Sequence, residues 1–415
     1  MPTQISLAQD GTITPEMIFV SEYENIEADH VKDLVAKGEA VILKNNIHNI
    51  KPLAVGEELK TKVNANIGTS QAHPELENEL VKLKSAIDAG ADAVMDLSTG
   101  GDLNSIREKI MEVSTVPVGT VPIYELMVSG KDLTIKNYIE IIKKQAQQGV
   151  DFFTIHSGIK KEHLPFIENR LMGVVSRGGA ALVAYIKNTG NENPLYKYYD
   201  DILEVCAQYD VTVSLGDGLR PGCINDATDK AQISELEVLG ELARKTREAK
   251  VQVMIEGPGH IPLNQIKENL DLKKKFAGKT PFYVLGPLVT DIAAGYDHIC
   301  GAIGGTLAAY YGASFLCYVT PREHLGLPDA NDVREGVIAS KIAAHAADLA
   351  LGKKGTIERD NKLSKARADF DWETEFNLSL DPAKARDRKE SCKTADYRVC
   401  SMCGDYCSMK ISRGI

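Results

Sequence analysis

The sequence predicts a (β/α)8 barrel with an N-terminal domain and a C-terminal arm that carries a cluster of cysteines. Two observations predict the barrel: short, continuously apolar runs alternate with amphipathic helical stretches, and almost every apolar run ends in polar or glycine-rich residues. A third observation, the grouping of Cys400, Cys403 and Cys407 close to the end of the chain, sets the arm apart from the barrel.

Composition divides the chain into three regions. Residues 1–60 are charged and contain few strand signals, so we expect an N-terminal helical domain there. Residues 61–350 alternate between strand and helix patterns and are expected to form the catalytic barrel. Residues 351–415 are again charged and poor in strand signals, which predicts a C-terminal helical arm leading to the cysteines.

The barrel strands are predicted from apolar runs that are typical of parallel strands buried on both faces. The candidate runs are 61–68, 91–98, 116–122, 151–158, 171–179, 211–218, 251–260, 281–288 and 313–320. A closed barrel needs eight strands, so one of these runs is expected to lie outside it. Between them, residues 229–250 predict a long helix whose buried face carries Ile233, Leu236, Leu239 and Leu242.

Charge and hydropathy exclude several classes of protein. A net charge of −10 argues against a broad nucleic-acid surface, although a few arginines and backbone N–H groups could still hold a small anion. No stretch approaches the ~20 apolar residues that a membrane-spanning helix needs, and the first residues lack the features of a secretory signal. We therefore expect a cytoplasmic protein with no membrane partner, whose cysteines are thiols or metal ligands.

Polar residues follow the predicted strands one after another. They are Asn66, Asp96, His156, Ser176, Asp217 and Glu256. Barrel enzymes place their active sites at the carboxyl ends of the strands, so this pattern predicts an active site at that end.

The cysteine cluster has the spacing C-x2-C-x3-C. Three close thiolates suit a four-iron cluster in which one iron stays open to bind S-adenosylmethionine (SAM). The spacing also fits a zinc site completed by Cys392 or a remote histidine, or a set of redox-active thiols. Spacing alone leaves these three alternatives open.

A series of motifs, from about residue 60 to the end, resembles the phosphomethylpyrimidine synthase family of thiamin biosynthesis. The motifs include VNANIG, MDLSTGGDL, PVGTVPIY, VVSRGG, SLGDGLRPG, VQVMIEGPGH, FYVLGPLVTDIA, LCYVTPREHLGLP and CSMCGDYCSMK. The resemblance, which fits the short form of the family, implies a radical-SAM lyase acting on 5-aminoimidazole ribonucleotide (AIR). It implies a [4Fe-4S] cluster on the three cysteines, an external electron donor, and a homodimer in which each arm serves the other subunit's barrel.

The same resemblance implies the site residues. Substrate contacts are expected at Asn66, Met95, Tyr124, His156, Ser176, Arg177, Gly178, Asp217, Gly218, Leu219, Arg220, Glu256 and Tyr283. His260 and His324 match the family's second metal site, which is expected to hold Zn²⁺ or another divalent metal.

Several residues depart from the pattern expected of the thiamin enzymes, among them Glu125, Ser157 and Ala294. Several of these residues are expected at the barrel mouth, where they could change the fate of the radical intermediate. They therefore favour a paralog that converts AIR to 5-hydroxybenzimidazole, the lower-ligand base of some anaerobic cobamides. The alternative is 4-amino-5-hydroxymethyl-2-methylpyrimidine phosphate (HMP-P) synthesis for thiamin. A remote alternative from another class is a non-catalytic, zinc-stabilised nucleotide-binding barrel.

Overall fold

The computed structural model describes residues 2–392 and 396–414. The chain divides into two compact units, Met1–Asp348 and Leu349–Ile415. The first unit contains the barrel and the N-terminal segment, and the second contains the cysteine motif.

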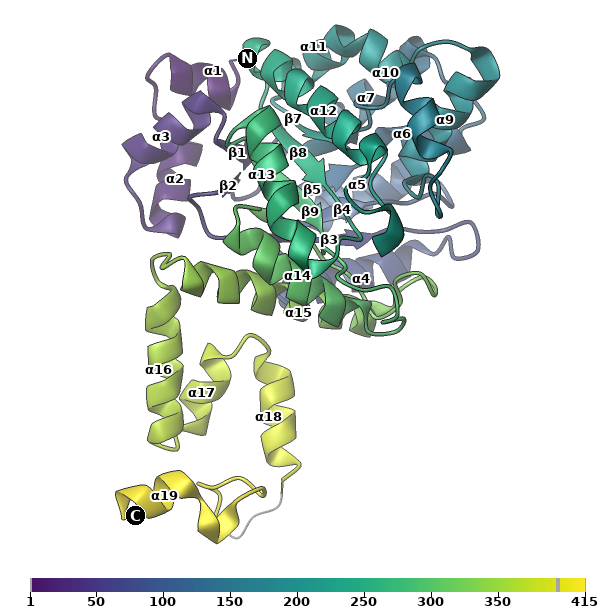
Figure 1. The fold of residues 1–415 in the computed structure, drawn as a ribbon. Helices are drawn as coiled ribbons and strands as arrows, with labels where there is room; N and C mark the ends of the chain where they lie inside the picture. Colours follow the sequence, from purple (N-terminus) through teal and green to yellow (C-terminus); the bar gives the residue numbers. More distant parts are fainter. Residues whose placement is uncertain (1, 393–395, 415) are drawn as a thin grey trace. The chain divides into compact units, whose positions relative to one another are not determined.

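The first unit is built on a closed barrel of parallel strands (Figure 1). The strands are β3 (Lys62–Ile67), β4 (Ala93–Asp96), β5 (Val118–Thr120), β6 (Phe152–Ile155), β7 (Thr212–Leu215), β8 (Val253–Gly257), β9 (Phe282–Leu285) and β10 (Phe315–Cys317). They are ordered β10-β3-β4-β5-β6-β7-β8-β9, and β10 also pairs with β9 to close the ring. This confirms the predicted (β/α)8 architecture.

Large rings fill the barrel interior at its amino-terminal end. Phe315 packs against Tyr283, with ring centroids 4.5 Å apart, and against Phe152 at 6.2 Å. A Cβ at Gly119 would lie 2.3 Å from the Phe152 ring, so the small residue on β5 makes room for the large one on β6. This packing gives the cavity at the other end a solid floor.

Helices surround the strands. They are α4 (Leu76–Asp88), α5 (Leu103–Val113), α6 (Pro122–Val128), α7 (Ile135–Gln147), α8 (Leu164–Ile167), α9 (Arg177–Thr189), α10 (Pro194–Lys197), α11 (Tyr199–Tyr209), α12 (Lys230–Glu248), α13 (Ile266–Ala277), α14 (Asp297–Tyr310) and α15 (Ala330–Ala350). The helix predicted over 229–250 is α12, and Asp229 caps it by accepting a hydrogen bond from Gln232 N–H. Leu236, Leu239 and Leu242 are buried on its inner face, whereas Ile233, predicted on the same face, is only partly buried.

The run that lies outside the barrel is 171–179. It forms a loop and then the first turn of α9, whose N-cap Ser176 accepts a hydrogen bond from Gly179 N–H. The run looks like a strand because it is apolar, but a capping serine followed by glycines favours a helix start.

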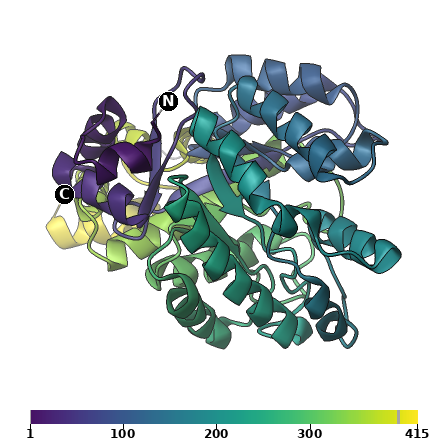
Figure 2. The ribbon, with the colours of Figure 1, turned by 90° about the horizontal axis from the view of Figure 1, so that it is seen from above.

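The N-terminal segment packs on the side of the barrel where β6, β7 and β8 begin. It comprises α1 (Gln4–Gln9), α2 (Pro15–Glu24), α3 (Ala28–Lys37) and the antiparallel pair β1 (Ala40–Leu43) and β2 (Leu53–Gly56). The segment therefore contains a small sheet in addition to the expected helices. The three helices lie together on one flank of the barrel (Figures 1 and 2). Gln252, just before β8, exchanges two hydrogen bonds with the backbone of Ile42.

The second unit is helical, as the composition indicated. It contains α16 (Thr356–Ala368), α17 (Trp372–Leu378), α18 (Pro382–Glu390) and α19 (Ser408–Arg413). Phe376 forms its small core, with the Arg386 guanidinium 4.8 Å from the ring centroid. Lys389 donates to the carbonyl oxygens of Tyr397 and Val399, which ties the segment before the cysteines to α18.

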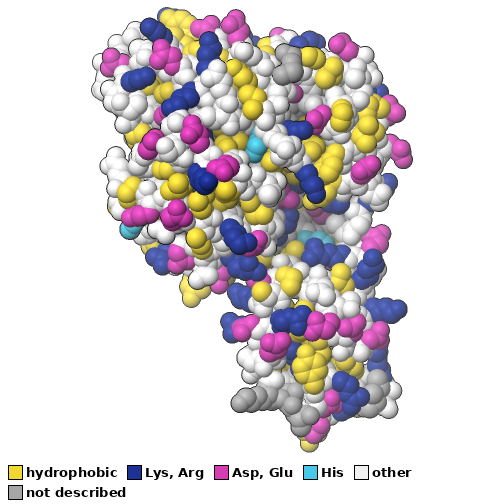
Figure 3. Space-filling view, turned by 180° about the vertical axis from the view of Figure 1, so that it is seen from behind, with side chains coloured by type: hydrophobic (Ala, Val, Ile, Leu, Met, Phe, Trp, Pro, Cys, Tyr) yellow, Lys and Arg dark blue, Asp and Glu magenta, His cyan; other side chains and the backbone are white. Residues whose placement is uncertain are grey.

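Charged side chains of both signs lie on the surface of the first unit. On the face of the first unit seen in Figure 3, acidic and basic side chains are interspersed and form no continuous basic stripe. In the described part of the chain, no helix is long and apolar enough to cross a bilayer.

Candidate active site

A cavity opens at the carboxyl ends of the barrel strands, where the polar strand ends predicted it. Its lining comprises Asn66, Met95, Leu97, Val121, Tyr124, Thr154, His156, Asp217, Arg220, Glu256, Gly257, Tyr283, Val284, Leu285 and Cys317. These residues come from widely separated parts of the sequence and converge because the parallel strands end at the same rim.

Most of the expected substrate contacts lie around this cavity. Those that line it are Asn66, Met95, Tyr124, His156, Asp217, Arg220, Glu256 and Tyr283. Gly218 and Leu219 form the turn between Asp217 and Arg220. Ser176, Arg177 and Gly178 do not line the cavity itself but lie beside it at the start of α9.

The start of α9 is held against the cavity wall. Ser176 Oγ lies 3.1 Å from His156 Nε2, and the Arg177 guanidinium stacks over the Tyr124 ring at 4.9 Å. A Cβ at Gly178 would lie 2.5 Å from the His156 ring, so only glycine allows this approach. The N-terminus of a helix attracts anions through its free N–H groups and its dipole. This corner of the cavity can therefore hold a phosphate.

The adjoining wall carries one cation and two carboxyl groups. Arg220 Nη1 lies 3.1 Å from Asp217 Oδ1. Burial, and then the negative charge of Glu256, raise the pKa of Asp217 to about 8. Burial also raises the pKa of Glu256, although Thr154 and Ser214 donate hydrogen bonds to it at 2.6 and 2.7 Å. Such a wall suits a neutral, hydroxyl-rich group such as a ribose.

His156 is the basis of a prediction on pH and stability. Burial, and then the charge of Arg220, lower the pKa of His156 to about 3 from an ordinary 6.5. As the pH falls below 6.5 the unfolded chain binds a proton at this residue that the folded chain does not, so stability is lost down to about pH 3. At pH 5 this linkage costs ~2 kcal/mol relative to pH 7. His156→Gln should lose less stability than the parent between pH 7 and pH 5, measured as urea midpoints; equal losses would contradict the prediction.

The sequence analysis did not identify three polar or thiol side chains of the cavity region. Thr154 and Ser214 hold Glu256 in place, and a polar residue within a buried strand is the signal that could have found them. The third is Cys317, whose thiol lines the cavity and accepts a hydrogen bond from Asn66 Nδ2 at 3.1 Å. Burial raises the pKa of Cys317 to about 12, so it remains a neutral thiol.

The two predicted metal-binding histidines lie side by side. The ring centroids of His260 and His324 are 5.2 Å apart. His260 Nδ1 is 2.8 Å from Asp291, and His324 Nδ1 is 3.7 Å from Asp297. The Nε2 atoms are thus the ones left for a metal, a common arrangement in metal sites. Over residues 2–392 and 396–414, however, no three His, Cys, Asp or Glu side chains are grouped so as to hold a metal ion.

The three cysteines lie on one short segment of the second unit. The backbone N–H groups of Cys403 and Met402 hold the pKa of the Cys400 thiol below its ordinary value, which favours the thiolate form that binds metal. Cys407 immediately precedes α19. Cys392 donates instead to the carbonyl oxygen of Arg388 at the end of α18. Cys400 is partly exposed, Cys403 is exposed and Cys407 is buried. Soft thiols of this kind are the ligands that an iron–sulfur cluster needs, although the described structure does not draw the three together into a metal-binding group.

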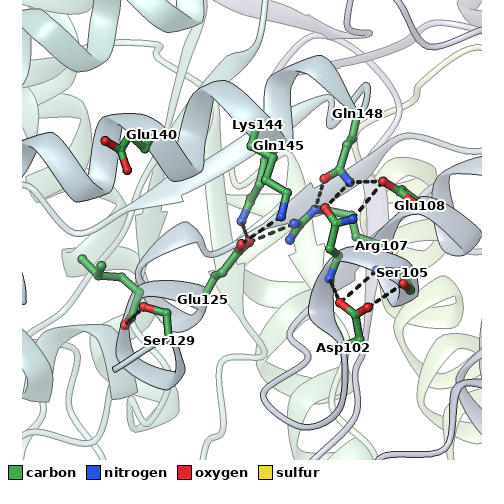
Figure 4. Close-up of polar contacts among 12 residues, drawn as sticks. Asp102, Ser105, Arg107, Glu108, Glu125, Ser129, Glu140, Lys144, Gln145 and Gln148 are labelled. Carbon is green, nitrogen blue, oxygen red and sulfur yellow. Dashed lines mark hydrogen bonds and ion pairs between the residues drawn. The ribbon is translucent and has the colours of Figure 1, made fainter. Parts of the chain in front are cut away.

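Glu125, expected at the barrel mouth, lies instead among the outer helices. Figure 4 shows its carboxylate between α5 and α7, where it is 2.8 Å from the Arg107 guanidinium and accepts a hydrogen bond from Gln145 at 2.8 Å. Ser157 is also buried away from the cavity and donates to the carbonyl oxygen of Leu195. Neither residue is part of the cavity lining.

Comparison with known proteins gives a match over nearly the whole chain. Residues 3–414 match the model of the radical SAM ThiC family. The chain belongs to the radical SAM ThiC family. It is 54% identical over 423 residues to phosphomethylpyrimidine synthase of Caldanaerobacter subterraneus subsp. tengcongensis, covering 99% of this chain and 97% of the relative. It is 52% identical to phosphomethylpyrimidine synthase of Methanocaldococcus jannaschii, covering 98% of each.

Among solved structures, a dihydropteroate synthase from Coxiella burnetii matches with a TM-score of 0.43 and 12% identity, covering 70% of this chain and 94% of that one. Such a distant likeness carries no argument about function. Membership of the radical SAM ThiC family makes the protein an enzyme and implies SAM and an iron–sulfur cluster as its cofactors.

Proposed function

We propose that this enzyme is a phosphomethylpyrimidine synthase, which converts AIR to HMP-P. The observation that carries the proposal is the identity of more than half over nearly full length to relatives named for that activity. The preference for the benzimidazole product has no such support. It rested on residues expected at the barrel mouth, and Glu125 and Ser157 face away from the cavity.

The cavity residues can divide the work of binding a ribonucleotide. Ser176 and the N–H groups at the start of α9 take the phosphate, with the adjacent Arg177 supplying positive charge. Arg220 holds the ribose hydroxyls by charge-assisted hydrogen bonds, and Asp217 and Glu256 add hydrogen bonds from their carboxyl groups.

The floor of the cavity supplies the surface for the heterocycle. Tyr283 OH accepts a hydrogen bond from Asn64 at 2.7 Å and lies 3.5 Å from the Met95 sulfur, so its ring is fixed. Asn66 lies beside them and supplies an amide. A fixed aromatic ring and a polar amide suit a small aminoimidazole.

Cys400, Cys403 and Cys407 would hold the four-iron cluster. When bound, the reduced cluster and SAM supply the adenosyl radical that begins the reaction. In that step, the residues of this chain would hold the ribose in a fixed position at the rim of the cavity. They would also exclude water, which prevents side reactions of a radical. His260 and His324 are proposed to bind a divalent metal, with Zn²⁺ as the best candidate for two imidazole ligands.

A homodimer in which the arm of one subunit serves the barrel of the other remains part of the proposal, as does an external electron donor. The arm forms a compact unit of its own, which is compatible with this exchange. A dimer that mixes a Cys403→Ala chain with an Arg220→Ala chain should regain activity, because one intact barrel would receive an intact cluster. Failure to regain activity in heterodimers that demonstrably form would favour a cluster serving its own barrel.

One anaerobic assay tests the proposed product. The reconstituted enzyme is incubated with AIR, SAM and a reductant, and the products are separated by mass spectrometry. We expect a phosphorylated hydroxymethylpyrimidine, while a benzimidazole without phosphate would overturn the assignment. A protein with ~4 irons per chain would exclude the zinc-stabilised, non-catalytic alternative.

A further inference from the structure

The turn that carries Asp217 and Arg220 into the cavity is held from outside the barrel. Leu219, inside this turn, is fully buried. Its N–H donates to Glu235 Oε2 at 2.6 Å, and its carbonyl oxygen accepts from Arg170 Nη2 at 2.7 Å. Buried backbone groups are usually paired within strands and helices. Here, both polar groups of one residue depend on side chains that are distant in sequence.

Glu235 comes from the inner face of α12 and is 2% exposed. Burial, and then the negative charge of Asp217, raise the pKa of Glu235 well above its ordinary value. A Cβ at Gly158 would lie 2.9 Å from its Cγ, and a Cβ at Gly218 would lie 3.2 Å from its Oε1. The Glu235 side chain therefore packs tightly between the segments that follow β6 and β7.

Arg170 comes from the loop after α8, and its side chain is 2% exposed. Its Nε and Nη2 atoms bind both carboxylate oxygens of Asp229, each at 2.7 Å. Asp229 is also the N-cap of α12. The two groups that hold Leu219 are thus both anchored on the first turns of this helix.

A shift of the turn would disturb two walls of the cavity. A Cβ at Gly179 would lie 2.3 Å from the carbonyl oxygen of Gly218, so the turn abuts the start of α9. Asp217 and Arg220 line the cavity, whereas Glu235 and Arg170 do not.

We infer that Glu235 and Arg170 are positioning residues for the ribonucleotide: they act through the Leu219 backbone to fix Asp217 and Arg220. This inference rests on the proposed function, because it takes the turn as a substrate contact. Groups that orient a binding residue commonly change affinity or activity by ~10-fold or more when they are removed.

The test uses the full-length holoenzyme with three changes on α12. Glu235→Leu removes the acceptor, while Glu235→Gln keeps a neutral acceptor of the same shape. Glu237→Leu is the matched control, because residue 237 is exposed on the same helix. The measurements are hydrogen exchange of the Leu219 amide, and KM and kcat with AIR.

We expect Glu235→Leu to speed exchange at Leu219 and to raise KM, each by ~10-fold, with a smaller change in kcat. Glu235→Gln should restore both values, and Glu237→Leu should change neither. Arg170→Met should raise KM in the same way, through the carbonyl side of the turn.

Two results would overturn the inference in distinguishable ways. If Arg220→Ala raises KM but Glu235→Leu leaves KM or the Leu219 exchange unchanged, the turn binds substrate without this support. If Arg220→Ala itself leaves KM unchanged, the assignment of the turn to the substrate fails, and the inference fails with it.

Discussion

Replacement of Cys403 by alanine is expected to remove the iron–sulfur cluster and all cleavage of SAM, while the barrel stays folded. With three thiolates as the only protein ligands proposed for the cluster, loss of one leaves two, too few to retain four irons. The cysteines belong to a compact unit separate from the barrel, so the barrel should keep its thermal midpoint. Iron analysis, SAM cleavage and a melting curve on the same anaerobic sample measure all three effects.

Cys392→Ala is the matched control, because it removes a thiol from the same unit. Its sulfur donates to the carbonyl oxygen of Arg388, and the change should leave iron content and SAM cleavage close to those of the parent. Loss of iron in the Cys392 variant, or full iron content in the Cys403 variant, would show that the ligand assignment is wrong.

The barrel could be predicted because its pattern is local. A buried parallel strand is apolar on both faces, and strands such as β6 showed this in a few consecutive residues, although β3 also carries Lys62, Asn64 and Asn66. The run 171–179 satisfied the same pattern without being a strand, since its residues pack as a loop and a capped helix start. The signal that separates the two is the capping serine Ser176 followed by glycines, which indicates a helix start.

The sequence could predict the site residues at the strand ends, but not the residues on the surrounding helices. Glu125 seemed to belong to the mouth because it follows Tyr124, which does line the cavity. Both lie on α6, however, and consecutive residues of a helix point about 100° apart, so Glu125 turns toward Arg107. Glu235 could not be predicted for a related reason: its role comes from a hydrogen bond with Leu219, which lies 16 residues away in sequence.

Arg220→Ala is expected to lower kcat/KM for AIR by ~100-fold, mostly through KM. The change removes a forked donor from the cavity and leaves Asp217 without the cation that faces it at 3.1 Å. Loss of the hydrogen bonds from a charged donor costs up to about 3 kcal/mol, which corresponds to roughly that factor. Without the arginine, the pKa of Asp217 should rise further above about 8, so the carboxyl stays protonated during binding.

Two further variants test this interpretation: one separates the charge of Arg220 from its paired donors, and the other is a control. Arg220→Lys keeps the positive charge without the two parallel donors, so it should recover only part of the lost affinity. Arg247→Ala is the control for removing an arginine elsewhere on the barrel, since Arg247 binds Thr280 at the amino-terminal end of β9. It should lower the thermal midpoint and leave KM unchanged. Equal KM values in the Arg220→Ala enzyme and its parent would contradict the placement of the ribonucleotide against this wall.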